Sequence, residues 1–186
     1  TATTSSPVGT YPITLAGGNA ANYTLSLTNG TLTVSDKIVP EITWPTLAAI
    51  TYGAPLSSTQ LNATAGGVAG AFAYAPATGT VLGAGSQPLS VTFTPTDTAT
   101  YAAASKTLTL TVNKAALTAT AENKSKLQGA PNPALTISYT GFVNGEAASV
   151  IDTAPTAATT ATTASPVGSY PITLSGGSDI NYALTL

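Results

Sequence analysis

Arginine, histidine, cysteine and methionine are absent from the 186-residue chain, and only 5 lysines and 7 acidic residues carry charge. Without histidine or cysteine there is no imidazole base, no thiolate nucleophile and no ligand set for a zinc site of the usual kind. Without arginine there is no planar donor for phosphate or carboxylate. The serine, threonine and lysine nucleophiles therefore lack a base partner of the usual kind. We expect no catalytic residues, no cofactor and no metal site.

The net charge of −2 and the lack of a basic run exclude a nucleic-acid partner, because nothing could displace the counterions of a phosphate backbone. No apolar run reaches the roughly 18 residues of a membrane helix, so we expect no transmembrane segment. Hydrophobic residues nevertheless make up 43% of the chain and occur in patterned runs. The chain is therefore expected to fold.

Threonine and alanine dominate what is present, with 36 and 33 copies respectively. Apolar residues alternate with threonine or serine along most of the chain, as in Leu108, Leu110 and Val112. This period of two predicts half-buried β-strands, and β-branched threonine suits their outer face. The segment 25–34, with Asn29-Gly30 at its centre, predicts a tight hairpin. No segment has a helical period, so the fold class is predicted to be all-β.

A long internal repeat divides the chain. The 27 residues that begin at Thr1 match those that begin at Thr160 at 19 positions. A weaker echo relates the segment 85–91 to the segment 168–174. We predict the C-terminal part of one module at 1–35, a complete module at 36–113, and a module that lacks its last strand at 114–186. The junctions are short and contain no flexible spacer, which favours a stiff chain of domains.

Strands at this spacing within about 80 residues predict tandem, immunoglobulin-like antiparallel β-sandwiches. Asp97 and Tyr101, before the last strands of the middle module, resemble the tyrosine corner of immunoglobulin domains. Asp179 and Tyr182 repeat this arrangement, and Tyr23 takes the same place in the first copy. We expect these residues to be structural, with each aspartate bonding the backbone of its turn.

Residues 114–186 resemble the bacterial MBG repeat through the segments 117–121, 129–135 and 139–145 and through the Tyr-Pro-Ile-Thr-Leu-Ser-Gly-Gly run that precedes Asn181-Tyr182. Residues 1–34 resemble the end of another such repeat. Residues 38–113 resemble a bacterial immunoglobulin-like repeat through Ile42-Thr43-Trp44-Pro45 and Ile50-Thr51-Tyr52-Gly53. The resemblance implies a large secreted or surface-attached bacterial protein of adhesin type, in which such repeats form a stalk.

A few residues could have either a functional or a structural role. Trp44, next to Pro45, could form a platform for a sugar, although a single tryptophan in a small sandwich usually packs in the core. Asp36 and Glu41 could meet a calcium ion at a junction, although isolated acids are usually solvated. Lys106 could point inward and form an isopeptide bond, or it could lay its stem on apolar surface. Asn62 and Asn113 are the candidate partners for that bond, and Glu41 is the candidate for the nearby acid that it requires.

Two functions follow from these observations. The first is a non-catalytic spacer on the bacterial surface or outside the cell, whose partners are the neighbouring modules of the same chain. The alternative is an adhesive module that binds a glycan or a surface protein through weak, repeated contacts. Pairing of uncharged edge strands between chains is a third reading, since few lysines protect those edges.

Overall fold

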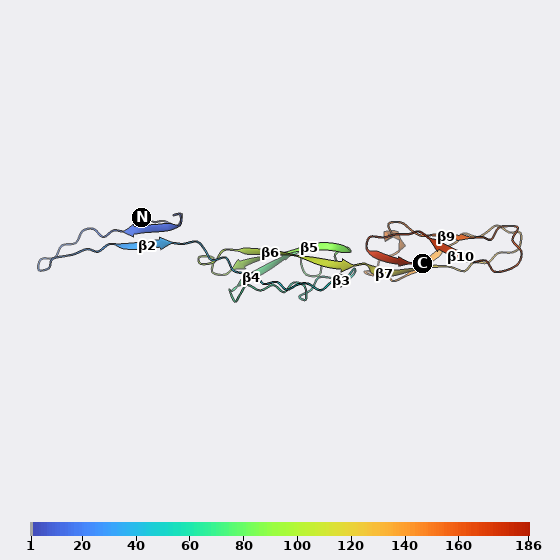
Figure 1. Cartoon of the computed structure of the whole chain (residues 1–186), viewed down its shortest axis with the longest axis horizontal. Coiled ribbons are helices and arrows are strands. Elements are labelled where there is room, and N and C mark those ends of the chain that lie inside the picture. The colour runs from blue at the N-terminus through green and yellow to red at the C-terminus, as the bar shows by residue number, and fades with distance from the viewer. Residues whose placement is uncertain (1) are drawn as a thin grey trace.

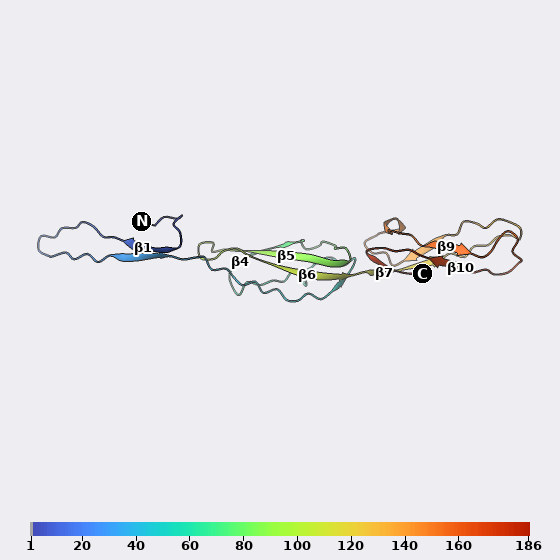
Figure 2. The ribbon, with the colours of Figure 1, turned by 45° about the horizontal axis from the view of Figure 1, so that its top comes forward.

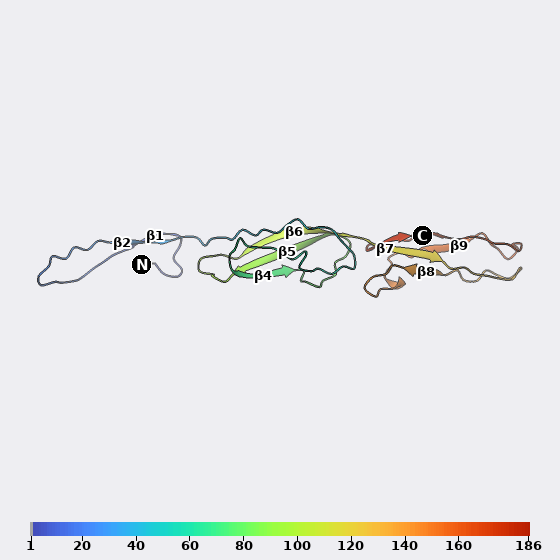
Figure 3. The ribbon, with the colours of Figure 1, turned by 90° about the horizontal axis from the view of Figure 1, so that it is seen from below.

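The computed structural model describes residues 2–186 as an elongated molecule in which three β-rich segments follow one another along the long axis (Figure 1). We call them the N-terminal segment (2–34), the middle segment (38–113) and the C-terminal segment (115–186). The same linear arrangement is visible after rotation by 45° and by 90° about that axis (Figures 2 and 3). The segments therefore meet end to end.

The N-terminal segment is a long, open hairpin. Strand β1 (Gly9–Ile13) pairs antiparallel with β2 (Gly30–Val34), and a loop of 14–29 joins them. The tight hairpin predicted for 25–34 is therefore wrong. Asn29 instead accepts a hydrogen bond from the backbone N–H of Leu15 through its side-chain oxygen at 3.1 Å, and Gly30 begins β2 opposite Ile13. The Asn-Gly pair thus starts a strand rather than making a turn.

The middle segment contains a four-stranded sheet in the order β3-β6-β5-β4. Its strands are β3 (Ile50–Thr51), β4 (Gly70–Ala75), β5 (Gly85–Pro95) and β6 (Ala104–Asn113). The alternation of apolar residues and threonine along β6 matches the alternation of buried and exposed positions. Leu110 and Val112 face the core, while Thr109 and Thr111 are exposed. Phe93 and Val91 on β5 complete the fully buried centre of this face.

A mostly irregular layer covers that face of the sheet, and Figure 3 shows this chain running beside β4, β5 and β6. It is tied by single bridges, between Thr43 and Thr64 and between Pro55 and Val81. Its buried side chains close the core of the middle segment; they are Ile42, Trp44, Leu56, Ala63 and Ala65. The second layer of the sandwich is therefore held by side-chain packing more than by a continuous ladder.

The C-terminal segment has two small sheets and one short 3₁₀ turn, Ala148–Val150. One sheet has the order β11-β7-β8, formed by β11 (Tyr182–Thr185), β7 (Ala115–Ala121) and β8 (Ile137–Thr140). The other pairs β9 (Thr156–Thr159) antiparallel with β10 (Ile172–Ser175). Leu117 and Tyr182 lie at the centre of its smaller core.

Two strand pairs are parallel, in contrast to the antiparallel pairing expected from the sequence. β3 runs parallel to β6, and β11 runs parallel to β7. In each pair one strand lies early in its segment and the other lies late. Parallel neighbours require a long connection, and here most of the segment provides it.

The all-β prediction is confirmed, since strands account for 38% of the chain and helical turns for 2%. No helix among residues 2–186 is long and apolar enough to span a membrane.

The core of the middle segment gives a direct test of this packing. Replacing Leu110, which is 0% exposed, by alanine should lower the free energy of unfolding by about 2–5 kcal/mol, because it leaves a cavity between the layers. Thr109→Ala on the exposed face of the same strand is the control, with an expected change within about 0.5 kcal/mol. Chemical denaturation followed by the fluorescence of buried Trp44 measures both, and equal effects would contradict the assignment of faces.

Candidate functional site: the junction between the middle and C-terminal segments

The polar and aromatic side chains of greatest interest gather where the middle segment meets the C-terminal segment. Only Lys114 separates the end of β6 from the start of β7. The ammonium of Lys114 donates a hydrogen bond of 2.6 Å to the backbone carbonyl of Asp179. The connection between the segments is therefore one residue long, and the side chain of that residue is itself held.

A shared carboxylate joins the two segments. The hydroxyl of Tyr52, in the middle segment, donates to Oε1 of Glu146 at 2.7 Å. The hydroxyl of Tyr182, in the C-terminal segment, donates to Oε2 of the same carboxylate at 2.6 Å. That hydroxyl also accepts a bond of 3.0 Å from the backbone N–H of Val143. Each carboxylate oxygen of the half-buried Glu146 is thus matched by a phenol, one from each segment.

This arrangement favours the neutral form of both phenols. The hydrogen bond to Glu146, with burial second, raises the pKa of Tyr52 from 10 to about 12. For Tyr182 burial is the larger cause and the bond to Glu146 the next, and together they raise its pKa above the usual value. A phenolate at either position would face the negative carboxylate at close range.

Aromatic packing surrounds the carboxylate. The rings of Tyr52 and Tyr182 meet edge to face, with centroids 5.5 Å apart and planes at 83°. Phe142 meets Tyr182 in the same way at 5.4 Å and 84°. Gly53 fits against Val143 with a positive φ of 96°, and a Cβ at this glycine would lie 2.7 Å from a methyl carbon of Val143. The two segments are therefore in direct van der Waals contact at this junction, which we call the joint.

A second set of hydrogen bonds lies beside this cluster. The side-chain oxygen of Asn181 accepts a bond of 2.9 Å from the backbone N–H of Ala84, which belongs to the middle segment. The carboxylate of Asp179 accepts bonds from the backbone N–H groups of Asn181 and Tyr182 at 2.7 and 2.8 Å. The carboxylate of Asp152 accepts a bond of 2.8 Å from the backbone N–H of Ile180, in the same turn. These bonds fix the turn that presents Asn181 and Tyr182 to the neighbouring segment.

The three repeat-equivalent tyrosines lie in different surroundings. Tyr182 is 1% exposed at the joint, Tyr101 is half-buried, and Tyr23 is 83% exposed. The carboxylate of Asp97 accepts bonds from the backbone N–H groups of Ala99 and Thr100 at 3.0 and 3.1 Å. The bonds from Thr100 hold the pKa of Asp97 below its usual value. Both candidate corner aspartates thus bond the backbone of their own turns.

The other candidates stand apart from the joint. Trp44 is 4% exposed, and its indole N–H donates to the carbonyl of Gln60 at 2.8 Å, so the indole presents no open face to a sugar. The ammonium of Lys106 donates to the carbonyl of Ile42 at 2.9 Å. Asp36 and Glu41 are both exposed. Among residues 2–186 no group of three or more acidic side chains is placed to hold a metal ion.

Sequence reasoning did not identify Tyr52, Glu146 or Asn181 as partners, because they are separated by as many as 94 and 97 positions from the groups they bond. One signal was present. The pair Asn181-Tyr182 is repeated as Asn22-Tyr23, and both members of the pair at 181–182 contact the neighbouring segment.

The chain is therefore an all-β protein, and the polar and aromatic side chains of its candidate site hold two segments together. A family model described as MBG domain (YGX type) matches residues 1–33 and 117–186. These ranges make up more than half of the chain, which therefore belongs to the MBG domain family. The family is one of structural repeat domains. Neither a curated protein nor a solved structure matches the chain significantly.

The phenol pair gives the junction a defined response to alkali. The pKa of Tyr52 is higher in the folded chain than in the unfolded one, so its contribution to stability is complete below pH 10 and is lost as the pH rises through about 12. An absorbance titration of tyrosinate should show a late-titrating phenol that Tyr52→Phe removes. Tyr182, whose pKa is also raised, should still titrate late in Tyr52→Phe. An unchanged amount of late-titrating tyrosinate in that variant would therefore refute the assignment.

Proposed function

We propose that this chain is a stiff, non-catalytic spacer from a large secreted or surface-attached bacterial protein of adhesin type. In this proposal residues 1–35, 36–113 and 114–186 belong to successive modules, and each module positions the next. The observation that carries the proposal is the joint at Glu146, where one carboxylate is bonded by a tyrosine from each side.

The geometry of the joint supports stiffness on three counts. A connection of one residue leaves little freedom for rotation between β6 and β7. Hydrogen bonds at Tyr52 and at Ala84 hold two different loops of the middle segment against the C-terminal segment. Close packing of Gly53 against Val143 leaves no room for a layer of water at that point. A flexible linker would have none of these features.

Membership of the MBG family supports the surface setting, since such domains occur as repeats of surface proteins. The chemistry of the chain suits that task. Its exposed strand faces carry threonine, which stays wettable without charge, and no cysteine is present to be oxidised. The burial of Trp44 removes the strongest candidate for a carbohydrate platform, which favours the spacer over the adhesive reading.

Stiffness can be measured directly because the chain has no cysteine of its own. Spin labels on cysteines introduced at the exposed positions Thr92 and Thr120 would report the distance between the middle and C-terminal segments. We expect a narrow distance distribution that Tyr52→Ala broadens, because this change removes both the bond to Glu146 and the ring contact with Tyr182.

Tyr170→Ala provides the matched control for that measurement, since it removes the same atoms at the far side of the C-terminal segment. It should leave the distance distribution unchanged. A broad distribution in the parent chain, or equal widths for parent and Tyr52→Ala, would remove the basis for the spacer.

A further inference from the structure

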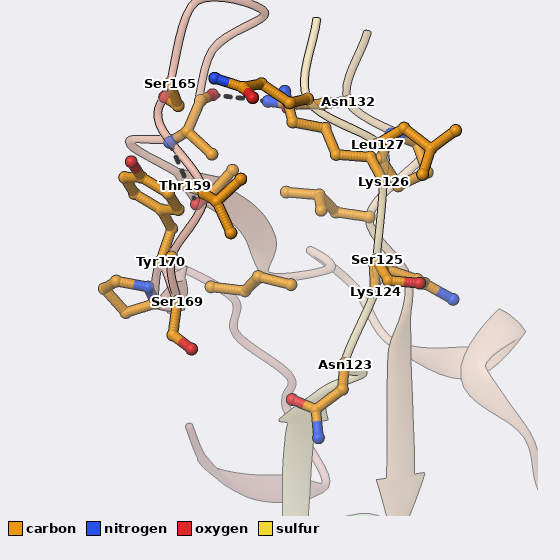
Figure 4. A pocket seen from close by; sticks show the side chains of 18 of the residues that line it. Asn123, Lys124, Ser125, Lys126, Leu127, Asn132, Thr159, Ser165, Ser169 and Tyr170 are labelled. Atoms are coloured by element: carbon orange, nitrogen blue, oxygen red, sulfur yellow. Dashed lines mark hydrogen bonds between the residues drawn. The ribbon is translucent and has the colours of Figure 1, made fainter. Parts of the chain in front are cut away.

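A cleft of about 470 Å³ opens in the C-terminal segment, away from the joint. One wall consists of the loop that carries Lys126 and Leu127, and the other consists of the segment 168–172 (Figure 4). Two side chains from the side of the first wall bond the segment 161–162. The ammonium of Lys126 donates to the carbonyl of Thr162 at 2.6 Å, and the amide of Asn132 donates to that of Ala161 at 2.6 Å.

The wall at 168–172 has counterparts elsewhere in the chain, and each of those is paired with a strand. The sequence Gly-Ser-Tyr-Pro at 168–171 corresponds to Gly-Thr-Tyr-Pro at 9–12 and to Gly-Ser-Gln-Pro at 85–88. The segment 9–12 pairs with Thr-Leu-Thr-Val at 31–34, and the segment 85–88 pairs with Thr-Leu-Thr-Val at 109–112. The register is the same in both, with glycine opposite valine and proline opposite threonine.

The local conformation of this wall also repeats. The hydroxyl of Tyr11 donates to the carbonyl of Pro7 at 2.7 Å, and that of Tyr170 donates to the carbonyl of Pro166 at 3.1 Å. The wall therefore has the same tyrosine-to-backbone hydrogen bond as its paired counterpart.

The opposite wall has a counterpart as well. Gly-Ala-Pro at 129–131 corresponds to Gly-Ala-Pro at 53–55, which aligns residues 126–127 with β3. In the middle segment β6 lies between β3 and β5, parallel to the first and antiparallel to the second. The two walls of the cleft thus correspond to the two neighbours of β6.

We propose that this cleft is an acceptor for one β-strand of the Thr-Leu-Thr-Val type, the last strand of an MBG repeat. The strand lies antiparallel to 168–171 and parallel to 126–127. Its leucine stands opposite Tyr170, its valine opposite Gly168 and its first threonine opposite Pro171. This inference goes beyond the spacer role and does not depend on it.

The prolines define which backbone groups bond. Proline has no N–H, so it fits without loss only at a pair that exchanges no backbone hydrogen bonds. Pro12 and Pro88 occupy such pairs, opposite Thr31 and Thr109. The next pair along, such as Tyr11 with Leu32, therefore exchanges both bonds. In the cleft, the backbone N–H groups of Tyr170 and Ile172 face the incoming strand.

The test uses the full 186-residue chain and a fluorescent peptide with the sequence of residues 28–36. Fluorescence anisotropy should give saturable binding of one peptide per chain. Hydrogen exchange should slow at the amides of Tyr170 and Ile172, because the added strand bonds them.

Two backbone-methylated peptides distinguish binding through strand pairing from non-specific binding of an apolar peptide to the cleft. N-methylation at the residue equivalent to Leu32 removes a bond to the wall and should weaken binding about fivefold or more. N-methylation at the residue equivalent to Thr31, whose N–H faces away from Pro171, should change binding by less than about twofold. Equal effects of the two methyl groups, no saturation, or protection outside both 168–172 and the loop at 126–128 would overturn the proposal.

Discussion

The direct passage of β6 into β7 is the constraint on which the joint depends. With Lys114 alone between the strands, the end of the middle sheet and the start of the next lie one residue apart. The short connection brings the loop at Tyr52 and the turn at Tyr182 into contact range, and the bonds to Glu146 then fix their relative rotation. With a longer connection, the same contacts would form at a greater cost in the conformational entropy of the connecting chain.

Scarcity of charge determines how the carboxylates of this chain are satisfied. Glu146 is bonded by two neutral phenols, and the buried Asp179 is bonded by backbone N–H groups. Among the described residues the one ion pair is between Lys124 and Glu122, at the surface. Ion pairs at a surface weaken with salt, whereas bonds from uncharged donors depend on it much less. The joint is therefore of a kind that tolerates changes of ionic strength.

The strands of the middle segment could be predicted from the sequence because alternation records a local property, namely which face each residue turns to the core. The alternation at Leu108, Leu110 and Val112 is an example. The joint could not be predicted in this way, since Tyr52 and Glu146 are 94 positions apart and neither belongs to a recognisable pattern. The hairpin at 25–34 failed for a related reason. The Asn29-Gly30 pair favours a tight turn locally, but in the structure Gly30 begins a strand and pairs with Ile13 instead.

The last strand of the middle segment, β6, connects the core of that segment to the joint. In the middle segment Leu110 and Val112 are buried core residues, while Asn113, the next residue, accepts a bond from the backbone N–H of Tyr52 through its carbonyl at 2.8 Å. The same strand therefore contributes to the core of the middle segment and orients the tyrosine that contacts the C-terminal segment. A strand in the cleft of the C-terminal segment would occupy the corresponding place, beside the loop at 126–127. The added backbone would then contact both walls of the cleft, as β6 contacts both β3 and β5 in the middle segment.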